Sequence, residues 1–247
     1  MKMMQTKNYL VPEIRKIVLV GCGGTGSYLA EGLASMIAGY RMNIILTLVD
    51  FDVVEDKNVY RQLFMPFDAT GKKYKSEALS EMLNMRFGLK SSFSTERIEK
   101  QISGGRDTLI ITCVDKVSVR KLFKDSQLWL DLGNDRTSGQ AIFGTTARPE
   151  TVYEEKRRWK NSPHVRALPN VYLRAGLAHL EDTPDVPSCA DTPFTEQGPL
   201  VNRWAAGIGL GIIEQLLVQG EVRTPCSFFD TVAGVVAPMR ITKEYLN

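Results

Sequence analysis

IVLVGCGGTG, at residues 17–26, is a short apolar run that passes directly into a loop containing four glycines. Such a run predicts a buried strand, and the loop predicts a sharp turn into a helix. Gly21, Gly23, Gly24 and Gly26 allow the backbone to approach a phosphate, and the unpaired N–H groups at a helix N-terminus favour negative charge. This stretch therefore predicts a nucleotide-binding turn, and a tight turn without a ligand is the alternative.

Strand and helix patterns alternate over the first 145 residues, as a parallel sheet with crossover helices requires. This order is typical of a Rossmann-like α/β fold, in which a doubly wound, mainly parallel sheet carries helices on both faces. The predicted strands lie at 16–20, 44–50, 92–97, 108–114, 128–132 and 141–146, and the predicted helices at 25–38, 72–86 and 116–124.

The second half of the chain loses this regular alternation. Residues 148–199 mix prolines with charged residues, so we expect a long irregular crossover segment with one short helix near 170–180. A helix at about 200–218 and two strands within 226–237 should then close the fold. We expect one domain over residues 1–247, composed of a nucleotide-binding half (1–147), the crossover segment (148–199) and closing elements (200–247).

The overall composition is that of a globular protein, with 247 residues, 43% hydrophobic and 24% charged. The formal charge of +3 is too mild to indicate a nucleic-acid partner. Charged residues precede the first apolar run, which argues against a signal peptide, and the apolar stretch 204–218 contains Glu214 and is short for a membrane span. We therefore expect a cytoplasmic protein that does not contact a membrane.

Polar residues follow the second predicted strand and suit a charged nucleotide. Asp50 ends that strand, where a carboxylate can accept hydrogen bonds from ribose hydroxyls. Asn58, Arg61 and Lys75 add hydrogen-bond donors and positive charge that a dinucleotide fold does not need. Arg61 offers a planar fork for phosphate oxygens and Lys75 a movable point charge. Together they predict ATP as the ligand.

The ordered motifs resemble those of the ubiquitin-activating-enzyme-like adenylyltransferases of the ThiF, MoeB and HesA family. The family signature is GxGGxG, a strand ending D-x-D-x-V, then N-x-x-R-Q, a lysine that opens a helix, and C-x-D-x-x-x-x-R. Residues 198–217 are similar to the family's late helix, and 129–145 with 186–191 most resemble the ThiF-type protein of the PRTRC gene cluster. The signature stands here as Gly21–Gly26, then Asp50 and Asp52, then Asn58, Arg61 and Gln62, then Lys75, and finally Cys113, Asp115 and Arg120.

The resemblance implies ATP-dependent activation of a small ubiquitin-like protein with a C-terminal glycine. Its C-terminal carboxylate would attack the α-phosphate and give an acyl adenylate and pyrophosphate. Asp52 and Gln62 would join the nucleotide-binding set, and Asp115 would hold Mg²⁺ through one carboxylate, as that ion prefers near phosphates.

Three assignments keep an alternative. Lys72 and Lys73 compete with Lys75, because Tyr74 occupies the position where the family spacing places the lysine. Asp115 is also suited to cap the next helix. Cys189 lies where ThiF-like relatives carry a cysteine that accepts the activated partner, and an inert loop cysteine is the other reading.

The chain departs from the family at two points. The paired CxxC motifs of ThiF and MoeB are absent, so we predict no zinc. The N-terminal arginine segment that reaches the nucleotide of a second subunit is also absent, which leaves both a monomer and a homodimer open. Two other functions compete: an NAD(P)-binding oxidoreductase, although no Tyr-x-x-x-Lys pair occurs, and a non-catalytic module that binds a ubiquitin-like protein.

Overall fold

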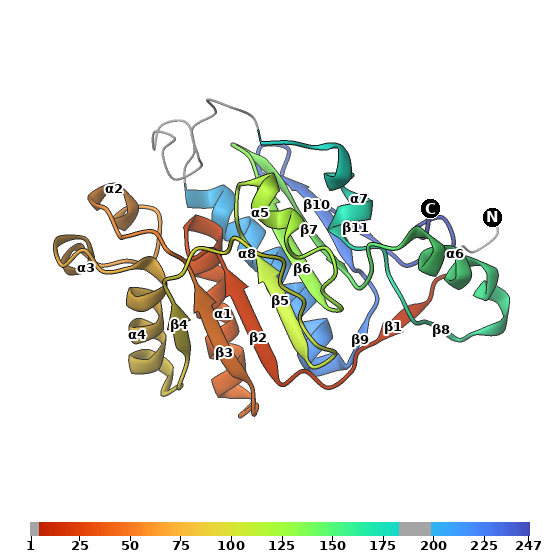
Figure 1. Cartoon of the computed structure of the whole chain (residues 1–247), viewed down its shortest axis with the longest axis horizontal. Coiled ribbons are helices and arrows are strands. Elements are labelled where there is room, and N and C mark those ends of the chain that lie inside the picture. The colour runs from red at the N-terminus through yellow and green to blue at the C-terminus, as the bar shows by residue number, and fades with distance from the viewer. Residues whose placement is uncertain (1–4, 183–198) are drawn as a thin grey trace.

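The centre of the molecule is an eight-stranded sheet, seen in a computed structural model that describes residues 5–182 and 199–247 (Figure 1). Its strand order is β11-β10-β7-β6-β5-β2-β3-β4, in which β6, β5, β2, β3 and β4 run parallel and β7, β10 and β11 extend the sheet in antiparallel fashion. The strands are β2 (Lys16–Val20), β3 (Ile45–Val49), β4 (Ser92–Ser94), β5 (Thr108–Thr112), β6 (Trp129–Asn134), β7 (Ser138–Gly144), β10 (Cys226–Asp230) and β11 (Val235–Met239).

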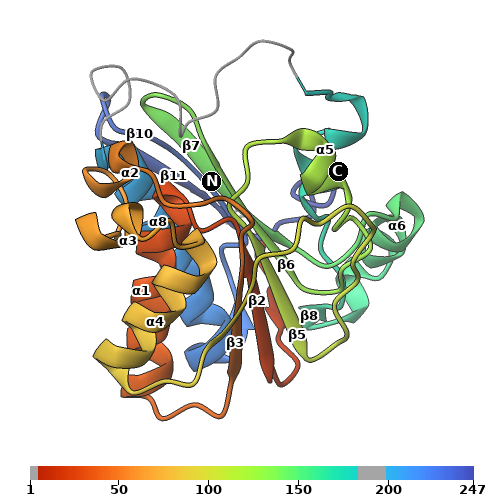
Figure 2. The same ribbon diagram turned by 60° about the vertical axis from the view of Figure 1, so that its left-hand side comes forward.

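Helices cover both faces of this sheet, which confirms the predicted α/β class. One face carries α1 (Gly24–Gly39), α4 (Lys75–Phe87) and α8 (Pro199–Glu214), while α5 (Val117–Lys121), α6 (Pro149–Arg157) and α7 (Val171–Arg174) lie on the other side (Figure 2). Strands covered on both faces need continuous apolar runs, and the residues of β5 are accordingly almost all buried. Short helices α2 (Asp56–Val59) and α3 (Pro66–Thr70) join β3 to α4.

The observed elements differ from the expected ones at three places. Residues 148–199 are not irregular throughout, because α6 forms there with Pro149 at its first turn, a position that tolerates the missing N–H. The helix predicted from residue 72 begins at Lys75, because Lys72 adopts a left-handed conformation with φ of 50°. The last predicted helix ends as α8 at Glu214 and continues as a π-helical turn, Gln215–Gln219, before Gly220.

A second, three-stranded sheet was not predicted. It has the order β8-β1-β9, with β1 (Asn8–Leu10) between β8 (His164–Val165) and β9 (Glu221–Val222). The remaining short elements are 3-10 turns at Trp159–Asn161 and Leu177–His179. Among the described residues, no helix combines the length and apolar character needed to cross a bilayer.

Candidate active site

A cavity of about 810 Å³ opens at the carboxyl ends of the parallel strands. The chain leaves β2 for β3 and β4 on one side and returns to β5 on the other, and ligands in open α/β sheets bind at such a switch point. Gly26 lies outside the lining, and Cys189 lies outside the described residues. The predicted residues that line the cavity are Gly21, Gly23, Gly24, Asp50, Asp52, Asn58, Arg61, Gln62, Lys75 and Asp115.

The glycines of the loop have different reasons to lack a side chain. Gly21 has φ of 90°, and a Cβ there would lie 2.5 Å from the carbonyl oxygen of Cys113. At Gly26 a Cβ would lie 1.8 Å from the carbonyl oxygen of Gly21, so this glycine permits the tight turn itself. A Cβ at Gly23 would meet nothing within 4 Å, although Gly23 lines the cavity. Open space beside this backbone fits a ligand that approaches the loop closely.

Asp50 is bound to the glycine loop through its carboxylate. The N–H of Cys22 donates to Oδ2 at 2.6 Å, and the N–H of Asp52 donates to Oδ1 at 2.9 Å. Burial raises the pKa of Asp50, and this rise is opposed by Lys75 and by the two backbone donors. Because each carboxylate oxygen has two lone pairs, both oxygens can still accept from a pair of hydroxyl groups.

The cavity distinguishes the three candidate lysines. Lys75 opens α4, is buried, and places Nζ 3.0 Å from Oδ2 of Asp52, while its backbone N–H donates to the Asp52 carbonyl at 2.8 Å. Lys73 instead pairs with Glu81, and Lys72 is exposed. Of the three lysines, only Lys75 belongs to the lining.

Two buried side chains of the lining carry polar atoms without partners. Asn58 is 1% exposed, and its Oδ1 accepts from the N–H of Glu55 at 2.9 Å. Its Nδ2 and the Oε1 of Gln62 have no hydrogen-bond partner among the described residues. Buried polar atoms are nearly always satisfied, so these two fit a polar ligand in the cavity. Arg61, between them in the chain, is also buried and lines the same wall.

Asp115 follows β5 and is exposed to the cavity. It is not the N-cap of α5, which is Lys116, and the N–H of Ser118 donates to Oδ1 of Asp182 at 3.3 Å. These contacts with the start of α5 hold the pKa of Asp182 below its ordinary value. Asp182 therefore supplies a carboxylate at the start of α5, the role that the alternative interpretation assigned to Asp115.

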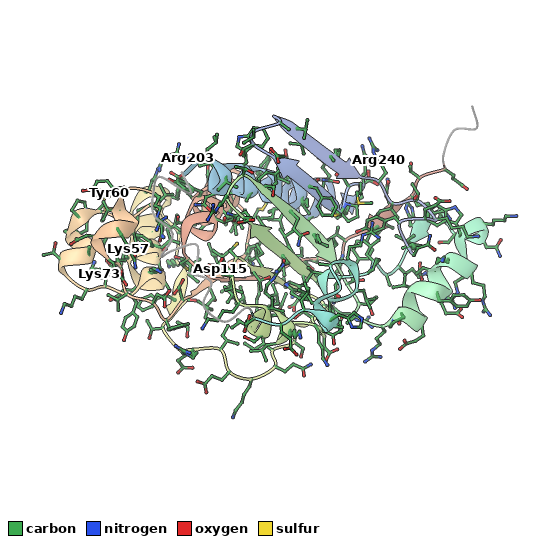
Figure 3. The ribbon with its side chains drawn as sticks, turned by 90° about the horizontal axis from the view of Figure 1, so that it is seen from above. Lys57, Tyr60, Lys73, Asp115, Arg203 and Arg240 are labelled. Atoms are coloured by element: carbon green, nitrogen blue, oxygen red, sulfur yellow. The ribbon has the colours of Figure 1, made fainter. Side chains whose placement is uncertain are left out.

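The cavity is also compatible with Mg²⁺ brought by a nucleotide. Figure 3 looks down on this edge of the sheet and shows Asp115 nearer the middle of the molecule than Lys57 of α2. Within residues 5–182 and 199–247, no group of three or more His, Cys, Asp or Glu side chains could hold a metal by itself. A single carboxylate such as Asp115 still suits Mg²⁺, which takes most of its other ligands from phosphates and water.

The described cysteines near the cavity are poor nucleophiles. Burial raises the pKa of Cys22, and the nearby Asp50 carboxylate adds to this rise. Burial and the carboxylates of Asp131 and Asp115 likewise raise the pKa of Cys113. A thiol must ionise to attack, so neither is suited to accept an acyl group.

Several cavity residues were missed by sequence reasoning. Thr25, Asn134 and Asn202 line the cavity and hydrogen-bond to one another, and Arg97 lies over the Phe51 ring at 4.2 Å. An asparagine within the apolar late helix was a detectable signal for Asn202, because a buried amide needs partners. The other contacts join segments far apart in the chain.

Arg120 of the family signature has a structural partner. Its Nε donates to Oδ1 of Asp131 at 2.9 Å, and a second nitrogen contacts Oδ2. Thr112 donates to the same carboxylate at 2.6 Å, and the Trp129 indole donates to Thr112 at 2.8 Å. This buried network joins the end of β5 to the first half of β6.

Comparison with solved structures supports the fold. Crystal structures of E. coli MccB with ATP and of the microcin C7 biosynthetic enzyme MccB with N-formylated MccA are 14% and 12% identical to this chain, with TM-scores of 0.57 and 0.58. PaaA is 14% identical with a TM-score of 0.56. The chain is covered to 92% in all three, but it spans only 64%, 65% and 64% of those proteins, respectively. At these identities the likeness establishes the fold alone.

Comparison of sequences gives a family but no curated relative. No curated protein matched the chain. The model of the ThiF family matches residues 11–143, which contain the glycine loop and every motif up to Arg120. This is the adenylyltransferase family that the motifs resembled, so the family prediction is confirmed.

Proposed function

Because this chain belongs to the ThiF family, we propose that it is an ATP-dependent adenylyltransferase that activates a carboxylate. We further propose that the carboxylate is the C terminus of a small ubiquitin-like protein ending in glycine. The chain would form a single domain that binds the partner, and it would act either as a monomer or as a homodimer. The PRTRC-type resemblance adds that the partner is encoded near this chain's own gene.

One observation carries the activity. A single cavity gathers open space beside Gly23, a carboxylate at Asp50, and two buried polar atoms, on Asn58 and Gln62, that have no partner among the described residues. The buried cation of Lys75 lies in the same wall. A nucleotide with its ribose on Asp50 and its phosphates along the glycine loop would supply acceptors for Asn58 Nδ2 and Lys75 Nζ, and its hydroxyl or amino groups would supply a donor for Gln62 Oε1.

The chemistry follows from the charges of this wall. An oxygen of the incoming carboxylate attacks the α-phosphorus, the bond from this phosphorus to the bridging oxygen breaks, and pyrophosphate leaves with the electron pair. Arg61, Lys75 and Asn58 stabilise the negative charge that spreads over the phosphates, since positioning and electrostatics supply most of the catalysis in phosphate transfer. Mg²⁺ held through Asp115 would neutralise part of the same charge.

The substrate class rests on the resemblance and on one neighbour. MccB is described in complex with N-formylated MccA, so a chain of this fold can take a partner as well as ATP. We propose that Cys189 then accepts the activated acyl group: its thiolate attacks the acyl carbonyl, a thioester forms and AMP leaves. Burial raises the pKa of Cys22 and of Cys113, which argues against these two thiols as the acceptor.

ATP–pyrophosphate exchange tests the proposal. The assay uses each short protein ending in Gly or Gly-Gly that is encoded beside this chain, with a truncated form lacking that glycine as the matched control. Exchange should require the intact tail, and Arg61→Ala and Asp115→Ala should each reduce it by about a hundredfold. Saturable NADH binding without ATP binding would instead establish the oxidoreductase. For Cys189, a reducible covalent complex should form with the wild-type chain and fail with Cys189→Ser.

A further inference from the structure

A cluster of polar side chains beneath the glycine loop has no role in the chemistry above. Thr25 lies in the first turn of α1, Asn134 ends β6 and Asn202 lies in the first turn of α8. Thr25 Oγ1 is 2.8 Å from Oδ1 of Asn134 and 3.2 Å from Oδ1 of Asn202. Asn134 Nδ2 also donates to Oδ1 of Asn202 at 3.2 Å. All three residues line the cavity.

Asn202 has one end of its amide bound and the other end open. Thr25 and Asn134 converge on its oxygen, so the remaining atom is the NH₂ group. No acceptor for this Nδ2 occurs among residues 5–182 and 199–247, although Asn202 is only 6% exposed. A side chain so well buried, held in place by two neighbours, presents to the cavity a donor that has no acceptor in the described part of the chain.

The position of this donor indicates its ligand. A Cβ added to Gly24 would lie 2.4 Å from Asn202 Nδ2, so the amide nitrogen lies against the first residue of α1. The unpaired N–H groups of that helix end favour an anion in the same place. Asp50 accepts from Cys22 within the loop, so a ribose on Asp50 places the phosphate next to it over the start of α1.

We propose that Asn202 Nδ2 donates a hydrogen bond to a non-bridging oxygen of the α-phosphate of ATP. This assignment rests on the proposed function, and it makes Asn202 a catalytic residue supplied by α8, more than 170 positions after the glycine loop. Thr25 and Asn134 are positioning residues, because they hold the amide with its nitrogen toward the nucleotide. The α-phosphate would thus be held by the start of α1 and the start of α8 together.

The test measures binding of adenosine, AMP and ATP by titration calorimetry. Asn202→Ala should weaken AMP and ATP about tenfold, the effect of one lost hydrogen bond to a charged group, and should change adenosine less than twofold. Asn202→Asp retains an acceptor for Thr25 and Asn134 but places a carboxylate beside the phosphate. Its loss of AMP binding should therefore exceed that of Asn202→Ala.

Arg203→Ala is the matched control, since Arg203 is the next residue of α8 but lies outside the cavity, over the Tyr28 ring. It should leave binding of all three ligands unchanged. Unchanged AMP binding in folded Asn202 variants overturns this assignment alone. If Asn202→Ala does not fold, the result for Asn202→Asp decides. A wild-type chain that binds neither AMP nor ATP overturns the proposed function, and this assignment falls with it.

Discussion

The cavity edge and the small sheet each bury a lysine, and the two lysines are satisfied in different ways. Lys7, in the small-sheet region, is 6% exposed and donates to the carbonyl oxygens of Trp159 and Ser162. Its Nζ also lies 4.5 Å from the centre of the Trp159 ring. Lys75, at the cavity, is 4% exposed and contacts the carboxylate of Asp52, which is half exposed.

The difference lies in what remains available for a ligand. An ammonium group has three donors, and Lys7 uses them on backbone and ring groups that tie distant segments together. Lys75 has one acceptor among the described residues, so further donors remain for phosphate oxygens. Burial of a cation is therefore a poor sign of function by itself, and the identity of its partners separates a structural lysine from a catalytic one.

The largest expected effect is at the cavity. Lys75→Ala should lower ATP–pyrophosphate exchange by about a hundredfold, because a lost donor to the transition state typically costs about 10²–10³ in rate. The measurement is exchange at saturating ATP, with the folded fraction determined by circular dichroism. Lys73→Ala is the matched control and should change exchange less than twofold, since Lys73 pairs with Glu81 at the surface. Wild-type exchange in Lys75→Ala would show that Lys75 is not catalytic, and its difference from Lys7 would then have no functional meaning.

The next effect concerns stability. Lys7→Met should lower the free energy of unfolding by about 2 kcal/mol, because the Trp159 and Ser162 carbonyls lose their donor. Urea denaturation measures this loss. Exchange per folded molecule should stay within twofold of wild type, since Lys7 is not part of the cavity lining. A variant with wild-type stability, or one that folds but loses exchange, would contradict the structural role of Lys7.

The smallest effect is the pH dependence that Asp50 gives to ATP binding. Burial raises its pKa, so on acidification it protonates at a higher pH than an ordinary aspartate and loses acceptors for ribose. ATP affinity should then fall by about tenfold, the cost of a hydrogen bond to a charged group.

Through Asp50, acidification changes the folding stability in the opposite direction to ATP affinity. A carboxylate whose pKa is raised in the folded state destabilises that state at neutral pH, and the penalty is relieved as the pH falls through the raised pKa. Loss of binding through Asp50 therefore does not require unfolding. In Asp50→Asn, ATP affinity should be lower than in the wild type, and the pH dependence that comes from titration of Asp50 should be lost. A wild-type pH profile in that variant would assign the titration to another group.

Local sequence patterns predicted the parallel half of the fold well. β2 occupies the predicted residues 16–20, because a strand covered on both faces is a continuous apolar run that local sequence alone reveals. The motif residues also converged on one cavity, since each follows a strand whose carboxyl end lies on the same edge of the sheet. The position of a residue directly after a parallel strand is therefore enough to predict which edge of the sheet it occupies.

The missed parts depend on contacts between distant segments. Two- and three-residue strands have no periodicity, and β1 pairs with residues more than 150 positions away. In α6 only Val152 and Glu155 are buried, so its apolar face was too small to be recognised. Asn202 shares its hydrogen bonds with α1 and β6, and no local spacing reveals that contact.

The switch point in the strand order has a consequence for synthesis on the ribosome. β2 borders β3 on one side and β5 on the other, so it stays an open edge until residue 112 has emerged. α1 lacks one of its packing partners until α8, which begins at Pro199, has been synthesised. The cavity lining is therefore complete only after Asn202 of α8 has been translated.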